Sequence, residues 1–413
     1  MKKKKLRSKD WFDNPKDPGL TALYLERYLN YGLTRKDLQS GKPIIGIAQS
    51  GSDLSPCNRH FLKLSKHIRR GIKEAGGVPM EFPTHPIQET GKRPTAALDR
   101  NLSYLSLVEV LYGYPLDGVV LTTGCDKTTP AALMAAATVN IPAIVLSGGP
   151  MLDGHYKGKK AGSGTIIWEA RKLYSKGEIN YDEFMDMATA SSPSEGHCNT
   201  MGTASTMNSI AEALGMSLPG SAIIPAPYPE RKIVSYKTGK RIVEMVNENL
   251  TPSKIMTKKA FENAVVVASA IGGSSNATTH LIAIAKQMGI KFDLSNWQKL
   301  GHKIPLLVNC QPAGEHLMEG FYRAGGVPGV MKELIKKKKL NYKVMTVTGK
   351  KFGENIKTAV TERIKKSEIN TAGFVSCCRG PILESALIEN FYQCPDCLKT
   401  FPRYPYNLFT SNS

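Results

Sequence analysis

Three cysteines of this chain lie in polar loops that contain glycine or proline, and this pattern constrains the fold more than any other feature. They are Cys57, Cys125 and Cys198, in segments 52–58, 124–130 and 196–203. Structural cysteines usually pack among apolar side chains, but asparagine, aspartate, lysine, serine and threonine surround these three. Such surroundings could stabilise a thiolate or a soft metal. Because the loops are far apart in the sequence, they form no local zinc knuckle, and only a fold that joins several loops can unite them.

The composition of the 413 residues, 41% hydrophobic and 22% charged, is typical of a soluble globular protein with two domains or one large domain with additions. No segment approaches the roughly 18 apolar residues that a membrane span needs. The basic residues 1–7 precede Ser8-Lys9-Asp10 rather than an apolar stretch, which predicts no signal peptide. We therefore expect a cytoplasmic protein, in which the eight cysteines are reduced or bound to metal.

The formal net charge of +20 raises the question of a nucleic-acid partner, because a basic surface attracts phosphates. The lysines are dispersed along the chain apart from Lys2–Lys5 and Lys336–Lys339, and no zinc-finger, RNP or helix-turn-helix pattern is present. We expect a lysine-rich solvated surface without a nucleic-acid or membrane partner. Its modest positive field would favour a small anionic substrate.

Short apolar segments rich in valine and isoleucine alternate with helical patterns. The predicted strands are 43–48, 78–83, 117–122, 141–147, 264–270 and 304–309, and the predicted helices include 60–74, 201–214 and 276–288. Asn199 or Thr200 is expected to cap the second helix, and Gly215 and Gly289 are expected to end the second and third. Several strands are apolar almost throughout, as strands covered on both faces should be. The alternation predicts an α/β layered domain with a mostly parallel sheet flanked by helices.

The polar motifs follow the predicted strands. Cys57 and Cys125 come after the first and third strands, and the glycine-rich segments 147–150 and 272–276 follow two others. Ligand sites of open parallel sheets lie beyond the carboxyl ends of the strands. Glycine-rich loops offer backbone N–H groups that suit a carboxylate or phosphate, although ordinary tight turns are the alternative interpretation.

Three thiolates without a fourth cysteine in a matching loop leave one metal position open. Zinc sites usually include histidine or closely spaced cysteine pairs, and iron–sulfur clusters normally have four cysteines. A cluster held by three would leave one iron free to act as a Lewis acid. Asp126 adds a hard oxygen ligand and Lys127 a cation in the same loop, and Glu89 could add a second carboxylate. Carboxylate ligands suit Mg²⁺. The alternative is that the cysteines pack separately and the carboxylates lie on the surface.

Longer motifs resemble a known family, the dihydroxy-acid and 6-phosphogluconate dehydratases, over roughly residues 10–365. Segments 124–130, 196–204 and 214–220 carry this resemblance. Segments 14–19, 22–27 and 85–89, with Asn-Thr-Met-Gly-Thr after Cys198, are similar to its sugar-acid branch of arabinonate and xylonate dehydratases. The branched-chain dihydroxy-acid dehydratases, the alternative activity, typically have a different sequence after the third cysteine.

The resemblance implies a site and a reaction. Cys57, Cys125 and Cys198 match the ligands of a [2Fe–2S] cluster with one open iron position, and Glu89, Asp126 and a carbamylated Lys127 match a Mg²⁺ site. The implied activity is a hydro-lyase that dehydrates a 2,3-dihydroxy sugar acid to a 2-keto-3-deoxy acid. The resemblance also implies a homodimer or homotetramer. The arm 1–34, with apolar Leu20, Leu23, Tyr24 and Leu25, would be an interface, unless its helix packs on its own domain.

Beyond about residue 366 the resemblance fades. The family continues into a β-rich C-terminal domain with a further glutamate ligand and the serine base, and neither residue can be assigned here. We therefore expect three parts: the arm 1–34, an iron–sulfur and Mg²⁺ domain 35–366, and a divergent tail 367–413. The tail contains Cys377, Cys378, Cys394 and Cys397, which indicate half a zinc ribbon, a frameshifted or prematurely ended reading frame, or a short variant.

Three functions from different classes remain open at this stage. The chain could be a working hydro-lyase whose base comes from another chain or residue, with His85, His197 and Ser274 as the first candidates. It could be a remnant that binds cluster and Mg²⁺ without turnover. It could also be a basic nucleic-acid-binding protein that uses the C-terminal cysteines.

Overall fold

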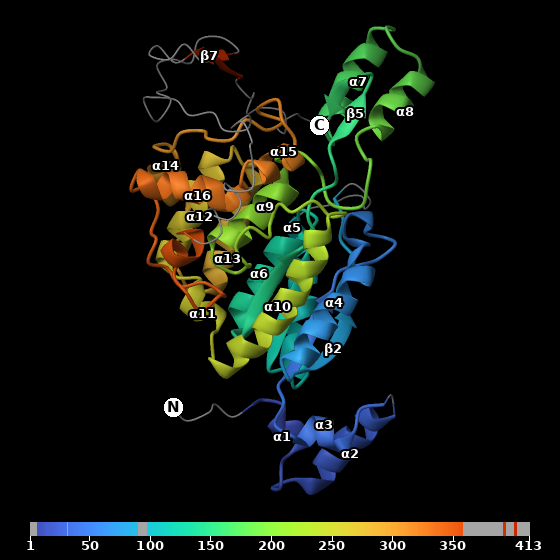
Figure 1. The fold of residues 1–413 in the computed structure, drawn as a ribbon, viewed down its shortest axis with the longest axis vertical. Helices are drawn as coiled ribbons and strands as arrows, with labels where there is room; N and C mark the ends of the chain where they lie inside the picture. The colour runs from blue at the N-terminus through green and yellow to red at the C-terminus, as the bar shows by residue number, and fades with distance from the viewer. Residues whose placement is uncertain (1–5, 31, 90–96, 358–390, 394–399, 403–413) are drawn as a thin grey trace.

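A four-stranded parallel sheet in the order β2-β1-β3-β4 forms the centre of the computed structural model (Figure 1). The structure describes residues 6–30, 32–89, 97–357, 391–393 and 400–402. The strands are β1 Ile44–Gln49, β2 Val78–Pro83, β3 Gly118–Thr123 and β4 Ala143–Ser147. Every residue of β1, β3 and β4 is buried, as expected for strands covered on both faces. The predicted α/β class with a parallel sheet is confirmed.

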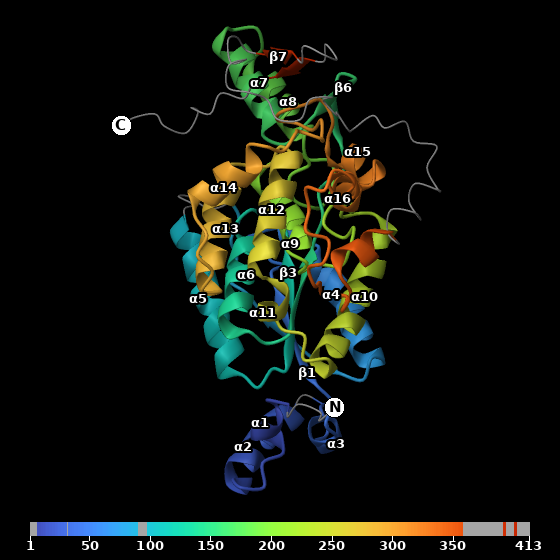
Figure 2. The same cartoon turned by 90° about the vertical axis from the view of Figure 1, so that its left-hand side faces the viewer.

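Helices cover both faces of this sheet. On one face, α4 (Phe61–Glu74) packs against α10 (Pro229–Asn247), and on the other, α5 (Ala97–Gly113) packs against α6 (Thr128–Val139) (Figure 2). The backbones of α4 and α10 touch where they cross. A Cβ added at Gly71 would overlap the Tyr236 carbonyl oxygen, and one at Gly239 would overlap that of Ile68. Glycine therefore sets the distance between these two helices.

A further group of helices packs beside α6 at the carboxyl side of the sheet. It comprises α9 Thr203–Ala213, α11 Pro252–Ile255, α12 Lys258–Ala270, α13 Asn276–Gln287, α14 Leu294–Gly301, α15 Met318–Arg323 and α16 Gly326–Lys336. Ten of the eleven residues of α9 are buried, from Ala204 through Ala213. Helix α9 thus lies in the centre of this group and contacts α6, α12, α13 and α16.

Two of the predicted strands are wrong. Segment 264–270 belongs to α12, and residues 304–309 form no strand. Helix α12 is surrounded by other helices, so its Ala and Val residues read as one continuous apolar run, as a buried strand would. In the second segment, Leu307 N donates to the carbonyl oxygen of Ala270, but none of the described strands pairs with this segment.

The predicted helices 60–74, 201–214 and 276–288 are confirmed within two residues as α4, α9 and α13. Gly215 and Gly289 end α9 and α13 with positive φ angles of 86° and 67°. The predicted N-cap of α9 is wrong. Gly202 occupies that position, because the side chain of Asn199 is bound elsewhere.

The first 39 residues contribute three helices at the amino end of the sheet (Figure 1). They are α1 Lys9–Phe12, α2 Pro18–Leu29 and α3 Arg35–Gln39. Asp117, just before β3, holds them, because its Oδ2 accepts hydrogen bonds from Ser8 Oγ at 2.7 Å and from Ile44 N at 2.8 Å.

The arm 1–34 buries only part of its apolar surface. Tyr24 stacks on Trp11 with ring centroids 4.1 Å apart, and Leu25 also packs against the core. Leu20 and Leu23 remain 43% and 55% exposed. Tyr24 and Leu25 therefore pack on their own domain, which was the alternative to an interface. The interface role of the arm stays a prediction.

Residues 151–196 form an excursion at the end opposite to the N-terminal helices (Figure 1). It contains the antiparallel hairpin β5 (Gly154–Tyr156) and β6 (Lys159–Ala161), then α7 (Thr165–Ser175) and α8 (Tyr181–Thr189). These elements pack around a small core of their own, made of Ala161, Ile166, Ala170 and Met187. A bridge between Pro150 and His197 joins the two ends of the excursion.

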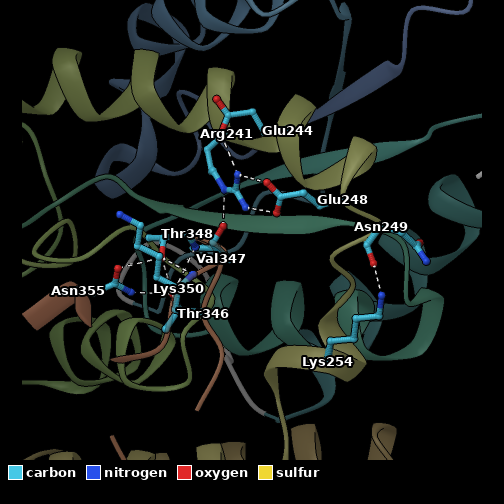
Figure 3. Close-up of polar contacts among 10 residues, drawn as sticks. All are labelled: Arg241, Glu244, Glu248, Asn249, Lys254, Thr346, Val347, Thr348, Lys350 and Asn355. Carbon is cyan, nitrogen blue, oxygen red and sulfur yellow. Dashed lines mark hydrogen bonds and ion pairs between the residues drawn. The ribbon is translucent and has the colours of Figure 1, made fainter. Parts of the chain in front are cut away.

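Residues 344–357 contact α10 through Arg241 (Figure 3). The Arg241 guanidinium bonds Glu248 Oε1 at 2.7 Å and also the carbonyl oxygen of Val347. Asn355 Nδ2 donates to Thr346 Oγ1 at 2.8 Å, which closes the turn between them. The bond between Arg241 and Val347 fastens the segment to α10.

In the tail, β7 (Phe391–Gln393) and β8 (Thr400–Pro402) pair antiparallel. The four tail cysteines lie outside the described residues, so the zinc prediction stays open. None of the described helices has the length and apolar character needed to cross a bilayer.

Candidate functional site

The motifs singled out in the sequence meet at the carboxyl edge of the sheet. Glu89 follows β2, Cys57 follows β1, and Cys125, Asp126 and Lys127 follow β3. Adjacent strands therefore deliver the hard and the soft groups to one place. Segment 147–150 follows β4 at the same edge, whereas 272–276 follows a helix, α12, instead of the expected strand.

Cys198 reaches this edge by a different route, because its loop lies between α8 and α9. His197 N donates to the carbonyl oxygen of Gly149 at 3.0 Å, and Met151 N donates to that of His197 at 2.8 Å. This pairing places Cys198 beside the end of β4. The thiol of Cys198 lies close enough to Cys57 and Asp126 to respond to their charges.

Two amide side chains join the loops of Cys57, Cys125 and Glu89. Cys57 is in the single-turn 3₁₀ helix η1 (Pro56–Asn58), and its N–H donates to Gln88 Oε1 at 3.0 Å. The next residue, Asn58, accepts a hydrogen bond from Cys125 N at 3.0 Å through its Oδ1. A Cβ at Gly124 would collide with this Oδ1, so glycine permits the close approach.

A third amide, that of Asn199, holds the Cys198 loop. Its Oδ1 accepts from Ser163 N at 2.8 Å, and its Nδ2 donates to the carbonyl oxygens of Leu152 at 2.8 Å and Ser191 at 3.3 Å. The carbonyl of Asn199 accepts from Met318 N at 2.9 Å. The fully buried residue thus ties the excursion and α15 to the cysteine loop.

The three thiols differ in acidity. A hydrogen bond from the Cys125 thiol lowers the pKa of Cys57, and the same contact, together with burial, raises the pKa of Cys125 well above its usual value. Burial raises the pKa of Cys198 to about 12. In the protein alone, Cys57 is therefore the thiol that ionises first, and only a bound cation could hold all three as thiolates.

The hard groups lie directly against this thiol cluster. Lys127 Nζ is 2.7 Å from Asp126 Oδ2 and 3.7 Å from Glu89 Oε1. Asp126 Oδ1 lies 3.3 Å from Cys125 Sγ and competes with Cys57 for the single thiol proton. Asp126 and Lys127 are buried, whereas the side chain of Glu89 is 48% exposed.

Their protonation reflects this crowding. Partial burial and the neighbouring charge of Asp126 raise the pKa of Glu89 to about 7. Burial alone would lower the pKa of Lys127, but its hydrogen bond to Asp126 and the charges of both carboxylates hold it above the usual value. An ammonium ion therefore balances the two carboxylates where no metal cation is bound.

The surroundings of the cysteines contain hydrogen-bonding capacity that the protein itself does not use. Among the described residues, seven buried side-chain polar atoms have no partner, and four of them belong to Ser55, Asn58, His60 and His197. Each of these four is within three residues of Cys57 or Cys198. Buried polar atoms normally find a partner, so this concentration fits a polar or ionic group held between the loops.

The donor set fits as well. Three thiols and an adjacent pair of carboxylates combine soft and hard ligands in one place. In the described part of the chain, no three or more His, Cys, Asp and Glu side chains already have the spacing of a metal site. The types of side chain present are those that the predicted cluster and Mg²⁺ sites would require.

The three candidate bases lie in different environments. His197 has no exposed surface, and burial lowers its pKa to about 3, so it supports the Cys198 loop as a neutral imidazole. Ser274 is in the turn between α12 and α13, with its Oγ 2.9 Å from Thr203 Oγ1. His85 is exposed in the loop after β2.

The sequence interpretation missed several residues of this site. Asn58 and Asn199 were not recognised, although each directly follows a cysteine. His280 of α13 responds to the charges of Asp126 and Lys127, and its Nδ1 is 3.0 Å from Arg100 Nη1. No pattern in the sequence connects these last two residues, which are 180 positions apart.

A family profile, described as dihydroxy-acid/6-phosphogluconate dehydratase N-terminal, matches residues 42–355. The chain belongs to this dehydratase family. The matched region contains the whole sheet and all six candidate ligands, so the structural core is the part that defines membership. The resemblance seen in the sequence motifs is confirmed.

Among similar members of the dehydratase family are two sugar-acid enzymes. The D-xylonate dehydratase of Caulobacter vibrioides is 60% identical over 353 residues, which are 86% of this chain and 59% of that protein. The L-arabinonate dehydratase of Rhizobium leguminosarum bv. trifolii is 45% identical over 365 residues, 87% of this chain and 62% of the relative. The dihydroxy-acid dehydratase of Halothermothrix orenii is 40% identical over 331 residues, 79% of this chain and 59% of the relative. The chain thus spans less than two thirds of the length of these dehydratases.

Proposed function

We propose that this chain provides the cofactor-binding part of a hydro-lyase that converts a 2,3-dihydroxy sugar acid into a 2-keto-3-deoxy acid. The observation that carries the proposal is the contact between a soft and a hard ligand group. Cys125 Sγ lies 3.3 Å from Asp126 Oδ1. A sugar-acid substrate is favoured over a branched-chain dihydroxy acid, because the xylonate and arabinonate enzymes are 60% and 45% identical and the Halothermothrix orenii dihydroxy-acid enzyme is 40% identical.

In this proposal Cys57, Cys125 and Cys198 hold a [2Fe–2S] cluster, and Glu89, Asp126 and carbamylated Lys127 hold Mg²⁺. When bound, the two groups supply Lewis acidity, which polarises substrate oxygens and promotes the departure of hydroxide. Support comes from the three thiols and the unpartnered polar atoms around them.

The residues of the chain prepare the site for these groups. Carbamylation would replace the positive charge of Lys127 by a negative one beside Asp126, 2.7 Å away, and beside Glu89. Three anionic groups at that spacing repel one another, so the modified lysine requires a bound cation. We therefore expect carbamylation and Mg²⁺ binding to depend on each other. The burial of Asp126 and Lys127 excludes water from the inner side of the site.

Removal of the C2 proton needs a base, and we propose that it comes from the part of the longer relatives that this sequence does not span. General-base catalysis typically contributes about 10²–10⁴-fold. The chain with cluster and Mg²⁺ should therefore bind D-xylonate or L-arabinonate weakly and form 2-keto-3-deoxy acid slowly or not at all.

The test compares this chain with a chimaera that appends the remaining region of the Caulobacter vibrioides relative. Both proteins are reconstituted anaerobically, and 2-keto-3-deoxy acid is measured from each sugar acid. Product from the chimaera supports the proposal, and the absence of product from a fully loaded chimaera contradicts it. Fast turnover by the 413-residue chain would place the base within it, and variants of His85, His197 and Ser274 would then locate it.

A further inference from the structure

The four unpartnered polar atoms around the cysteines fall into two chemical kinds. His60 Nε2 lies 2.9 Å from the carbonyl oxygen of Gly148, and His197 Nδ1 lies 3.1 Å from that of Cys198. Because a carbonyl accepts, these two nitrogens carry the ring protons. The free ring nitrogens, His60 Nδ1 and His197 Nε2, can therefore only accept a hydrogen bond. Ser55 Oγ and Asn58 Nδ2, in contrast, can donate.

The orientation of the Asn58 amide is fixed by its partner. Cys125 N–H can donate only to an oxygen, so the atom 3.0 Å away must be Oδ1 and the other must be Nδ2. Asn58 is fully buried and directly follows Cys57. Among the described residues, its NH₂ group has no hydrogen-bond partner. An unpaired buried donor is energetically unfavourable, which calls for an acceptor at this place.

We propose that Asn58 Nδ2 donates a hydrogen bond to a sulfur atom of the cluster site, an inference that rests on the proposed function. Thiolate and sulfide sulfurs only accept hydrogen bonds, which matches the free donor. Asn58 would then have two positioning roles, because Oδ1 holds the Cys125 loop while Nδ2 contacts the sulfur. Hydrogen bonds to cluster sulfurs influence the reduction potential. This bond should raise it, because the reduced cluster is more negative and gains more from the donor.

The comparison with Asn199 shows why the role is assigned to Asn58. Both residues directly follow a cysteine and both are fully buried. The two amide hydrogens of Asn199 are already used by the carbonyl oxygens of Leu152 and Ser191. Asn199 therefore has a purely architectural role, and Asn58 retains a donor for the bound group.

The first experiment needs no variant. The chain is produced with asparagine labelled with nitrogen-15 only in its side-chain amide, loaded with cluster and reduced, and pulsed electron paramagnetic resonance measures nitrogen couplings to the cluster. The proposal predicts a nitrogen-15 coupling from an asparagine side chain. A loaded, reduced cluster without such a coupling would overturn it. A wild-type chain that takes up no cluster would instead contradict the proposed function.

Asn58→Leu then assigns the coupling, with Asn263→Leu as the matched control. Asn263, on α12, is equally buried. Its Nδ2 donates to the carbonyl oxygen of Asn341 at 3.0 Å, and its Oδ1 accepts from Asn341 N at 2.7 Å. We expect Asn58→Leu to lose the coupling and to lower the reduction potential, while Asn263→Leu changes neither. Persistence of the coupling in Asn58→Leu would overturn the assignment. If Asn58→Leu fails to load, the labelled wild-type chain decides alone.

Discussion

Cys310 is the natural comparison for the three loop cysteines. It belongs to the main hydrophobic core, which contains none of the three loop cysteines, and its Sγ lies 3.8 Å from the carbonyl oxygen of Leu317. It therefore behaves as a small apolar residue in the core, as most free cysteines do.

Serine substitutions of the three loop cysteines should therefore affect the cluster, and a serine substitution of Cys310 should not. After anaerobic reconstitution, the wild-type chain is expected to be brown, with about two irons and two sulfides per chain, as a [2Fe–2S] centre requires. Cys57→Ser, Cys125→Ser and Cys198→Ser should each abolish the visible absorption, and Cys310→Ser should retain it. Equal absorption in all four variants would show that the loop thiols are not ligands.

Buried histidines make the stability of the protein depend on pH. Burial lowers the pKa of His60 to about 4, below the value near 6.5 of an unfolded chain. Between these values the unfolded state binds more protons, so the free energy of unfolding should fall as the pH falls from about 6.5 to 4. For one such group the loss is on the order of 3 kcal/mol.

Denaturant unfolding at several pH values checks this expectation. His60→Gln can keep a donor toward Gly148 but has no titrating ring, so its stability should fall less steeply with acid than that of the wild type. His67→Gln is the control: His67 lies in α4, the helix that His60 precedes, and is only half-buried, so this variant should leave the slope unchanged. An unaltered slope in His60→Gln would assign the pH dependence to other groups.

At the scale of elements, the crossing of α4 and α10 depends on glycine. Gly239→Ala should lower the free energy of unfolding by about 1–3 kcal/mol, because the new methyl group overlaps the Ile68 carbonyl and the helices must separate. Gly113→Ala, at the end of α5 with its nearest neighbour 3.8 Å away, should have no such cost. Chemical denaturation of both variants measures the difference, and equal stability would contradict the close crossing.

The sequence predicts a strand or helix correctly where its pattern of apolar residues reflects the elements that cover it. Strands β1, β3 and β4 are short, bounded by polar loops and covered on both faces, so their apolar runs are interpreted correctly. The run 264–270 has the same appearance for a different reason, because α12 is enclosed by helices and needs no polar face. The composition of a short segment does not distinguish a buried strand from a buried helix. The elements that pack against the segment decide between them.

The same reasoning separates the two halves of the candidate site. Cys57, Cys125 and Glu89 follow strands, so sheet topology alone predicts that they converge. Cys198 follows a helix and reaches the edge through the pairing of His197 with Gly149 and Met151. Backbone pairing of this kind leaves no signature in residue type, and for Cys198 the family motif, rather than local pattern, was informative.

At the scale of the whole molecule, the exposed Leu20 and Leu23 of the arm 1–34 suggest assembly. We expect the chain to form a homodimer or homotetramer and a chain shortened to start at Thr34 to lose that state, because exposed apolar side chains favour a protein partner. Light scattering measures the change. Ser8→Ala, which removes a hydrogen bond to Asp117 but keeps Leu20 and Leu23, is the control. An unchanged oligomeric state of the shortened chain would place the interface elsewhere.

The bridge between Pro150 and His197 fixes the two ends of the excursion 151–196, whereas the length of the excursion can vary. Residues 151–196 leave the sheet and return to it at one point, so the excursion is a closed loop whose ends are already fixed. Doubling the length of such a loop costs only about 0.6 kcal/mol. The position of Cys198 therefore depends on this bridge and on the bonds of Asn199 to Leu152, Ser163 and Ser191, and a change of length between α7 and α8 leaves both in place.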